Sequence, residues 1–193
     1  MTQLRIAVAD DEPRMLQFFG KALEQLGHQV VIKATNGGEL VEQCRASCPD
    51  LIITDIKMPD MDGLEAVRQI AAGQIIPTIL VSGFHDPEYV EAALREHVMA
   101  YIIKPIKKDD LEPAIRLVMR RFKELQVLQQ QADDLRHALE SRKLIERAKG
   151  ILMKRAGMSE EQTFRRLQQL SQQKNMKMAE IAEMIVTAEE AMS

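Results

Sequence analysis

Cysteine is scarce in this sequence, and long apolar runs are absent. The two cysteines, Cys44 and Cys48, are four residues apart in a stretch of helical periodicity. This spacing puts both on one helical face, which favours a role in packing over a disulfide and leaves metal binding as the alternative. No run approaches the roughly 18 apolar residues of a membrane span, and the first residues, MTQLRIAVADDE, lack the charged-then-apolar pattern of a signal peptide. We therefore expect a cytoplasmic protein without a membrane partner.

Charge is distributed unevenly along the 193 residues, whose net charge is −3. Residues 1–118 contain 12 basic and 18 acidic side chains, whereas residues 119–193 contain 14 basic and 11 acidic ones. Within the second part, residues 142–177 hold 10 basic side chains against 3 acidic ones. A basic segment joined to an acidic one suggests that the basic segment binds a polyanion.

Five short runs rich in β-branched residues alternate with segments of helical periodicity in the first part of the chain. The runs cover residues 4–10, 28–34, 51–55, 77–83 and 99–104. Between the first two runs, one apolar stripe ends at Gly27, a favourable helix stop. The stripe consists of Leu16, Phe19, Leu23 and Leu26. Strands that alternate with helices predict a parallel sheet with both faces covered.

Polar side chains follow the strands at their carboxyl ends, where parallel sheets bind ligands. These side chains are Asp10, Asp11, Asp55, Ser82 and Lys104. Three carboxylates brought together repel one another unless a cation is present, which implies a hard divalent ion, and Mg²⁺ suits a site with few protein oxygens. With Lys104 and Ser82 nearby, Asp55 is placed to attack a phosphoryl group. The alternative is that Asp55 begins an ordinary polar loop.

The motifs AVADDE, ITDIKMPDMDG, VSG and YIIKP resemble the receiver domain of two-component response regulators, over residues 1–118. The resemblance implies a flavodoxin-like five-stranded parallel sheet, a sensor histidine kinase as partner, and Asp55 as the phosphoacceptor. The metal ligands that it implies are Asp55, Asp11, Asp10 through water, and the backbone carbonyl of Lys57. The residues that it implies for phosphoryl binding and switching are Ser82, Tyr101, Lys104 and Pro105, the last after a cis peptide bond. Tyr101 is also compatible with a core ring at a strand end.

Residues 119–141 contain neither glycine nor proline and have no strand character. Apolar residues recur there with the three-and-four spacing of a coiled-coil seam. The seam consists of Leu125, Leu128, Leu135 and Leu139, with Val118 and Ala132 in the same register. We expect this connector to form a homodimer on phosphorylation, although about three heptads give only a marginal coiled coil by themselves. The alternative is an amphipathic helix that lies back on its own protein.

Residues 142–193 are expected to form a small three-helix domain. The first helix continues the connector as far as Gly157, and the second begins at a capping box of Ser159 and Gln162. We expect Asn175 to cap the third helix. The residues expected to be buried on the second and third helices are Phe164, Leu167, Leu170, Met178, Ile181, Ala182 and Ile185.

Gly150 lies in the middle of the first of these helices. Glycine there costs about 1 kcal/mol relative to alanine, so we expect either another helix or a nucleic-acid backbone to approach closely. Lys143, Arg147 and Lys154 share one helical face, and Arg142 and Lys149 share an adjacent one. A solvated charged surface is the usual explanation, but few acids accompany these cations, which favours phosphate contacts. Because Phe164 is expected to be buried, base stacking is not expected.

The run ALESRKLIERAKGILMKRAGMSEEQTF and the residues after it, as far as residue 188, resemble the ANTAR domain. This domain is the RNA-binding module of AmiR/NasR-type transcription antiterminators. Thr163 departs from the family, which usually has alanine there. The candidate RNA-binding residues are Arg142, Arg147, Lys149, Lys154, Arg165 and Arg166.

The two resemblances together predict a phosphorylation-controlled regulator rather than an enzyme. A sensor kinase phosphorylates Asp55, the protein dimerises, and the C-terminal domains bind hairpins in a nascent transcript, so that an alternative terminator hairpin does not form. The alternatives are a DNA-binding response regulator, since three basic helices also suit a helix-turn-helix, and a partner-switching protein that binds an acidic protein.

Overall fold

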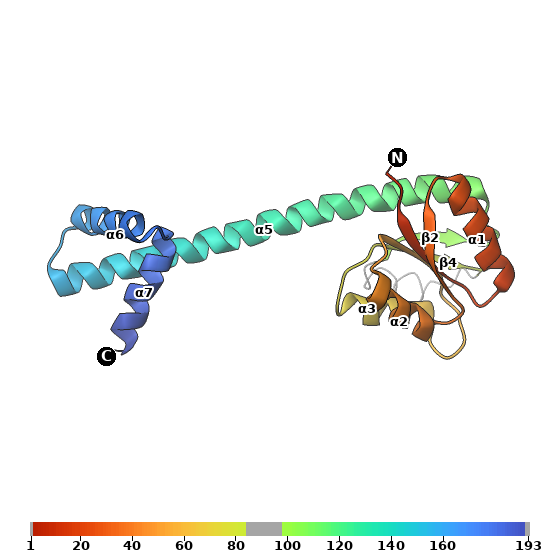
Figure 1. Cartoon of the computed structure of the whole chain (residues 1–193), viewed down its shortest axis with the longest axis horizontal. Helices are drawn as coiled ribbons and strands as arrows, with labels where there is room; N and C mark the ends of the chain where they lie inside the picture. The colour runs from red at the N-terminus through yellow and green to blue at the C-terminus, as the bar shows by residue number, and fades with distance from the viewer. Residues whose placement is uncertain (1, 84–97, 192–193) are drawn as a thin grey trace. The chain divides into compact units, whose positions relative to one another are not determined.

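The computed structural model describes residues 2–83 and 98–191. The chain divides into two compact units, Met1–Gln126 and Val127–Ser193, which are drawn in Figure 1. Each unit has its own hydrophobic core. The division falls inside one long helix, after Gln126.

The first unit is built on a five-stranded parallel sheet. Its strands are β1 (Arg5–Ala9), β2 (Gln29–Ala34), β3 (Leu51–Asp55), β4 (Thr78–Ser82) and β5 (Val98–Ile103). The order across the sheet is β2-β1-β3-β4-β5, and every neighbouring pair is parallel. This is the flavodoxin-like order, with a reversal of strand order between β1 and β3. The predicted sheet is confirmed.

Helices cover both faces of the sheet. On one face, α1 (Pro13–Gln25) and the start of α5 (Lys108–Ala156) pack on the sheet through Phe19, Leu23 and Leu111. On the other face, α2 (Gly37–Ser47) and α3 (Gly63–Ala71) contribute Leu40, Cys44 and Ile70. Cys44 is therefore a packing residue, as expected. The helix expected between the fourth and fifth strands falls in residues 84–97, outside the described residues.

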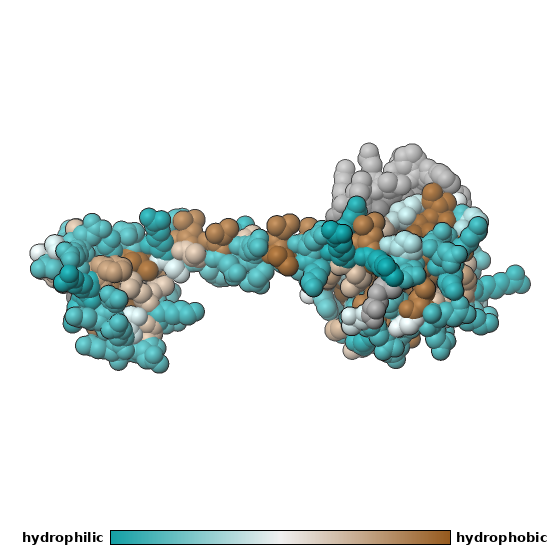
Figure 2. Space-filling model, turned by 90° about the horizontal axis from the view of Figure 1, so that it is seen from above, coloured by the Kyte–Doolittle hydropathy of each residue, from teal (hydrophilic) through white to brown (hydrophobic). Residues whose placement is uncertain are grey.

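The helix α5 is 49 residues long and includes the whole predicted connector. The seam leucines are solvent-exposed along it: Leu125 is 54% exposed, Leu128 61%, Leu135 72% and Leu139 54%. Figure 2 shows the brown of hydrophobic side chains along this stretch of helix. Within residues 2–83 and 98–191, no helix combines the length and apolar character needed to cross a bilayer.

The second unit consists of the last part of α5 with α6 (Glu160–Lys174) and α7 (Met178–Ala191). Its core is formed by Ala148 of α5, Leu167 of α6, and Ile181, Ala182 and Val186 of α7. The predicted capping box at the start of α6 is present, because the Ser159 and Gln162 side chains each accept a hydrogen bond from the other's backbone N–H.

Two expectations for this unit are wrong, and one of the two explanations offered for Gly150 is excluded. Phe164 is 45% exposed rather than buried, because it lies beside the buried face of α6 and not on it. Asn175 ends α6 in a left-handed conformation, with φ 51°, instead of beginning α7. No other helix approaches Gly150 among the described residues, because a Cβ built there meets no heavy atom within 4 Å.

Candidate functional site

Three carboxylates converge at the carboxyl end of the sheet. Asp10 and Asp11 follow β1, and Asp55 is the last residue of β3, the strand next to it. Their ligand oxygens all lie within 4.8 Å of one another. Asp10 is fully buried and Asp55 is 8% exposed, whereas Asp11 is exposed. The sequence prediction of a carboxylate cluster is therefore correct, and the cluster has one solvent-facing side.

Lys104 joins two of these carboxylates. It follows β5, and its Nζ lies 2.6 Å from an Asp55 oxygen and 2.9 Å from an Asp10 oxygen. Burial disfavours the ammonium, but the hydrogen bonds to Asp55 and Asp10 outweigh burial and raise the pKa of Lys104 above its ordinary value. Lys104 is therefore a fixed positive charge against the face of Asp55.

Asp10 is the most strongly desolvated carboxylate of the cluster. Burial raises the pKa of Asp10, although hydrogen bonds from Lys104 and from the backbone N–H of Glu12 act in the opposite direction. Holding an ionised Asp10 in this position therefore opposes folding. A bound cation would relieve that cost, and the oxygen-only donor set suits a hard divalent ion such as Mg²⁺.

Hydrogen bonds from the nearby residues Thr54 and Lys57 fix the position of Asp55. The N–H of Lys57 donates to Asp55 Oδ1 at 3.3 Å, and the hydroxyl of Thr54 donates to the Asp55 carbonyl at 2.9 Å. Thr54 is fully buried, so its hydrogen bond is shielded from water. These contacts leave Asp55 with a defined orientation at the end of its strand.

Gly63 is a positioning residue for which the sequence analysis predicted no role. It begins α3, and a Cβ at this position would collide with the carbonyl of Asp55. Its N–H donates to the carbonyl of Ile56 at 2.8 Å, which ties the helix to the loop after β3. The available signal was the Asp-Gly pair before a helical segment, since Asp62 is the N-cap of α3 and accepts from the backbone N–H of Glu65.

The remaining predicted residues lie around the same edge. Ser82 is the last residue of β4 and is 3% exposed. Tyr101, on β5, is partly buried against Ile56 and Leu80. The peptide bond between Lys104 and Pro105 is cis, as expected.

The second unit carries the predicted basic residues, and half of them are paired with carboxylates. Arg147 of α5 contacts Glu190 of α7 at 2.8 Å. Lys149 contacts Glu146 at 3.1 Å and Glu160 of α6 at 2.6 Å, and its side chain is only 9% exposed. The remaining paired residue is Arg165, which contacts Glu161 at 2.6 Å.

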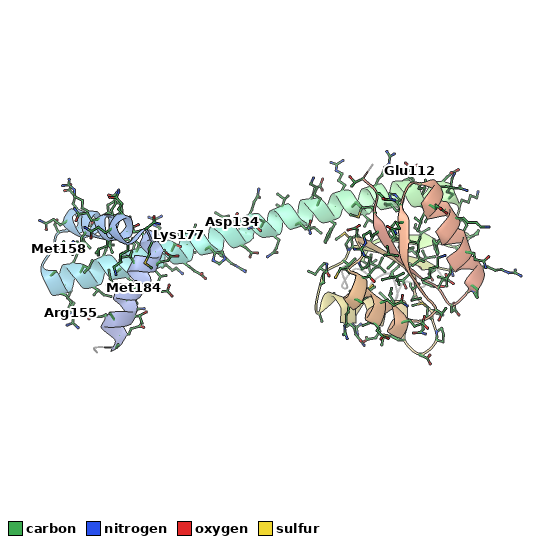
Figure 3. The ribbon with its side chains drawn as sticks, in the orientation of Figure 1. Glu112, Asp134, Arg155, Met158, Lys177 and Met184 are labelled. Carbon is green, nitrogen blue, oxygen red and sulfur yellow. The ribbon has the colours of Figure 1, made fainter. Side chains whose placement is uncertain are left out.

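Six further basic side chains of this unit are exposed and have no carboxylate in ion-pair distance within the described residues. They are Arg142, Lys143, Lys154, Arg166, Lys174 and Lys177. Figure 3 labels Lys177, between α6 and α7, and also Arg155, which is paired with Glu189 at 3.0 Å. The surface therefore keeps free cations that a polyanion could neutralise.

Comparisons with known protein families match both the unit that contains the sheet and the helical unit that carries the basic residues. The family model of the response regulator receiver domain matches residues 6–116, which is more than half of the chain. The family model of the ANTAR domain matches residues 133–186. The chain is an ANTAR response regulator. Its receiver comprises the sheet with the carboxylate cluster, and its ANTAR domain contains most of the paired and free cations described above.

Known relatives of this response regulator support the assignment. It is 36% identical over 182 residues to the transcriptional regulatory protein PdtaR of Mycobacterium tuberculosis, which covers 94% of this chain and 89% of the relative. The receiver domain of a modulated diguanylate cyclase from Desulfovibrio desulfuricans superposes with a TM-score of 0.60 at 27% identity, covering 65% of this chain and 99% of that one. The response regulator domain of Thermotoga maritima CheB gives 0.58 at 29% identity, over 62% and 98%.

Proposed function

We propose that phosphorylation of Asp55 by a sensor histidine kinase controls dimerisation of this protein and its binding to RNA hairpins in nascent transcripts, giving transcription antitermination in the cytoplasm. The observation that carries the proposal is the contact of Lys104 with both Asp55 and Asp10, beside Asp11, in a chain that also carries an ANTAR domain. A carboxylate cluster held around one lysine is suited to receive a phosphoryl group.

The transfer step follows from this arrangement. An oxygen of Asp55 forms a bond to phosphorus while the bond between phosphorus and the nitrogen of the kinase histidine breaks, and the imidazole leaves. Asp10, Asp11 and Asp55, with the backbone carbonyl of Lys57, are the groups that would hold Mg²⁺. The bound ion would neutralise charge on the phosphoryl oxygens.

Other side chains then respond to the phosphoryl group. Lys104 can exchange its contact with Asp55 for one with a phosphoryl oxygen, and Ser82 can donate its hydroxyl to another. Pro105 directly follows Lys104, and Tyr101 lies on β5 opposite Leu80, two residues before Ser82, which supports their proposed role in switching. The chain binds and holds the group, so its role is that of a regulator rather than that of an enzyme acting on a separate substrate.

The leucine seam is the proposed dimer interface. Four leucines of one helical stripe remain more than half exposed, so each can still release more than half of the roughly 1.5–3 kcal/mol that full burial of an exposed leucine gives. A second copy of the same helix offers the complementary stripe. Because a short seam is only marginally stable alone, association through it is open to control by the receiver.

Sedimentation of the phosphorylated protein tests this interface. Replacing Leu128 and Leu135 by lysine should prevent dimerisation, because both charges would be buried at the seam, while labelling of Asp55 stays intact. The matched control replaces Gln129 and Gln130, exposed residues of the same helix, by lysine. A Leu128→Lys/Leu135→Lys variant that still sediments as a dimer would move the interface elsewhere.

The proposed RNA-binding residues fall into two groups. Arg142, Lys154 and Arg166 are free to contact phosphates directly. Arg147, Lys149 and Arg165 must exchange a glutamate for a phosphate, and this exchange is possible because the glutamate partners are exposed. Phosphate contacts of both kinds make binding salt-dependent.

The function as a whole is tested by retention of RNA on the full chain. The probe is a pool of stem-loop RNAs with a fixed stem and a randomised loop, compared at matched salt with duplex DNA of the same length. We expect the chain labelled at Asp55 by a small phosphodonor and Mg²⁺ to retain stem-loops better than the unlabelled chain. Preference for duplex DNA would favour a DNA-binding regulator, and loss of all nucleic-acid binding would favour partner switching through the C-terminal helices.

A further inference from the structure

Four residues of α5 form one stripe on the helix surface. Lys143, Arg147, Gly150 and Lys154 recur with spacings of four, three and four residues, which places them above one another on the same face. The stripe extends over about 16 Å of helix axis. It is exposed and lies outside the core of the second unit, to which the same helix contributes Ala148. Gly150 is therefore a gap without a side chain inside a row of cations.

The fold gives no reason for a glycine at this position. Gly63 and Gly37 are required, because a Cβ at either would collide with a carbonyl oxygen, and Gly157 has a φ of 61°. Gly150 has neither feature, since it has helical backbone angles and an added Cβ would meet no described heavy atom within 4 Å. Alanine would make the helix more stable there. A partner outside the fold is the remaining explanation for the missing Cβ.

The charges around the gap define the chemistry of that partner. Lys143 and Lys154 have no carboxylate in ion-pair distance within the described part of the chain. Arg147 is paired with Glu190, but its side chain remains 59% exposed and that of Glu190 57% exposed, so an incoming anion can reach this pair. Three cations thus flank a position at which the helix backbone itself is accessible.

We infer that the phosphodiester backbone of the RNA lies directly against α5 at Gly150, closer than a Cβ would allow, with Lys143 and Lys154 neutralising phosphates on either side. This inference rests on the proposed RNA-binding function and specifies where on α5 the RNA backbone makes contact. Arg147 turns from Glu190 to a phosphate in the complex. The glycine thereby provides shape complementarity for a strand that passes between the lysines.

Two substitutions of the full-length chain test the inference, with stem-loop RNAs retained from the pool by the wild-type chain as the probe. Gly150→Ala should raise the melting temperature of the free protein and weaken RNA binding, by about tenfold if one charge-assisted contact is lost. Gly150→Leu should weaken binding further. Ser141→Ala is the matched control, because it also favours the helix but lies outside the stripe, and its RNA affinity should be unchanged.

Gly150→Ala is expected to stabilise the free protein and at the same time to weaken RNA binding. These opposite effects distinguish a contact with RNA from a structural role of the glycine. Unchanged affinity of Gly150→Ala and Gly150→Leu for RNA that the wild-type chain binds would overturn this inference and leave the proposed function intact. Lower stability of free Gly150→Ala would also overturn it, because packing would then explain the glycine. If loss of dimers in sedimentation accompanies the loss of RNA binding, the partner at Gly150 is a second copy. Failure of the wild-type chain to retain any stem-loop overturns the proposed function and this inference together.

Discussion

Lys104 and Lys149 each donate hydrogen bonds to two carboxylates, yet they belong to different kinds of site. Lys104 joins Asp10 and Asp55, which lie 94 and 49 residues before it and are almost fully buried. Lys149 joins Glu146 and Glu160, which are 3 and 11 residues away and have side chains that are 58% and 71% exposed. The first arrangement is imposed by the sheet, and the second is a local contact at the surface of the ANTAR domain.

The difference in solvent exposure between the two sites determines which chemistry each site can support. In the receiver the charges are held away from water, so their mutual energies are large and their positions are set before any ligand arrives. In the ANTAR domain, hydrogen bonds to Glu160 and, to a smaller extent, to Glu146 raise the pKa of Lys149. Both glutamates are exposed to water, which screens these contacts, so they contribute little stability. A buried cluster suits chemistry at one atom, whereas an exposed basic surface suits exchange of glutamates for phosphates.

The largest effect is expected at the buried cluster. Asp55→Asn should abolish labelling by a small phosphodonor in the presence of Mg²⁺, because an amide cannot act as the nucleophile. Asp60→Asn is the matched control, since Asp60 has a φ of 65° that asparagine tolerates, and labelling should persist. Mass spectrometry of the intact chain measures both. Full labelling of Asp55→Asn would mean that the acceptor is another residue.

A smaller, graded effect is expected at the basic surface. The double substitution Lys154→Ala/Arg166→Ala should lower the slope of log affinity against log salt by about 1.4, that is, about 0.7 for each lost phosphate contact. Lys123→Ala removes an exposed cation from the first unit and serves as the control, with an unchanged slope. Binding of stem-loop RNA across a salt series gives the result. An unchanged slope in the double variant would assign the contacts to the paired cations instead.

The raised pKa of Asp10 leads to a prediction on stability. Its folded pKa lies above the unfolded value of 3.8, so ionised Asp10 destabilises the fold at neutral pH, and this cost is lost as pH falls through the folded pKa toward 3.8. Asp10→Asn should therefore stabilise the metal-free protein at pH 7, and by progressively less as pH falls below the folded pKa. Urea unfolding at several pH values tests this. A stability difference that grows on acidification would contradict the burial argument.

Metal binding provides a second test of the same cluster. Mg²⁺ should stabilise the wild-type protein more than Asp10→Asn, because the ion offsets the buried charge. Asp11→Ala should weaken Mg²⁺ binding more than Asp10→Ala, if Asp11 binds the ion directly and Asp10 binds through water. Calorimetric titration with Mg²⁺ compares them, and equal losses would remove the distinction between the two carboxylates.

The smallest effect is expected from a single surface glutamate. Glu190→Gln removes the partner of Arg147 and should strengthen RNA binding by about twofold, since an exposed ion pair is worth between zero and 1 kcal/mol. Glu183→Gln, an exposed residue of the same helix, is the control. Weaker binding by Glu190→Gln would show that the ion pair positions Arg147 for RNA instead of competing with it.

Much of the receiver site could be predicted, because its residues occupy strand ends. Asp10, Asp55, Ser82 and Lys104 each stand where a β-branched run stops, and parallel strands bring such positions to one edge. The role of Gly63 could not be predicted, because it depends on the distance between the first turn of α3 and the carbonyl of Asp55. That distance is set by packing of the helix on the sheet.

The sequence by itself determined the alternation of strands and helices, the carboxylate cluster, the exposed leucine seam and the capping box of α6. Each of these follows from local periodicity or from a position at the end of an element. Only the tertiary structure decided that Phe164 is exposed, that Asn175 ends α6, and that Lys149 is held by Glu160 while Arg166 stays free. Helical periodicity identifies an apolar face but not its edges, and the ion pairs between helices depend on how α5, α6 and α7 pack around their small core.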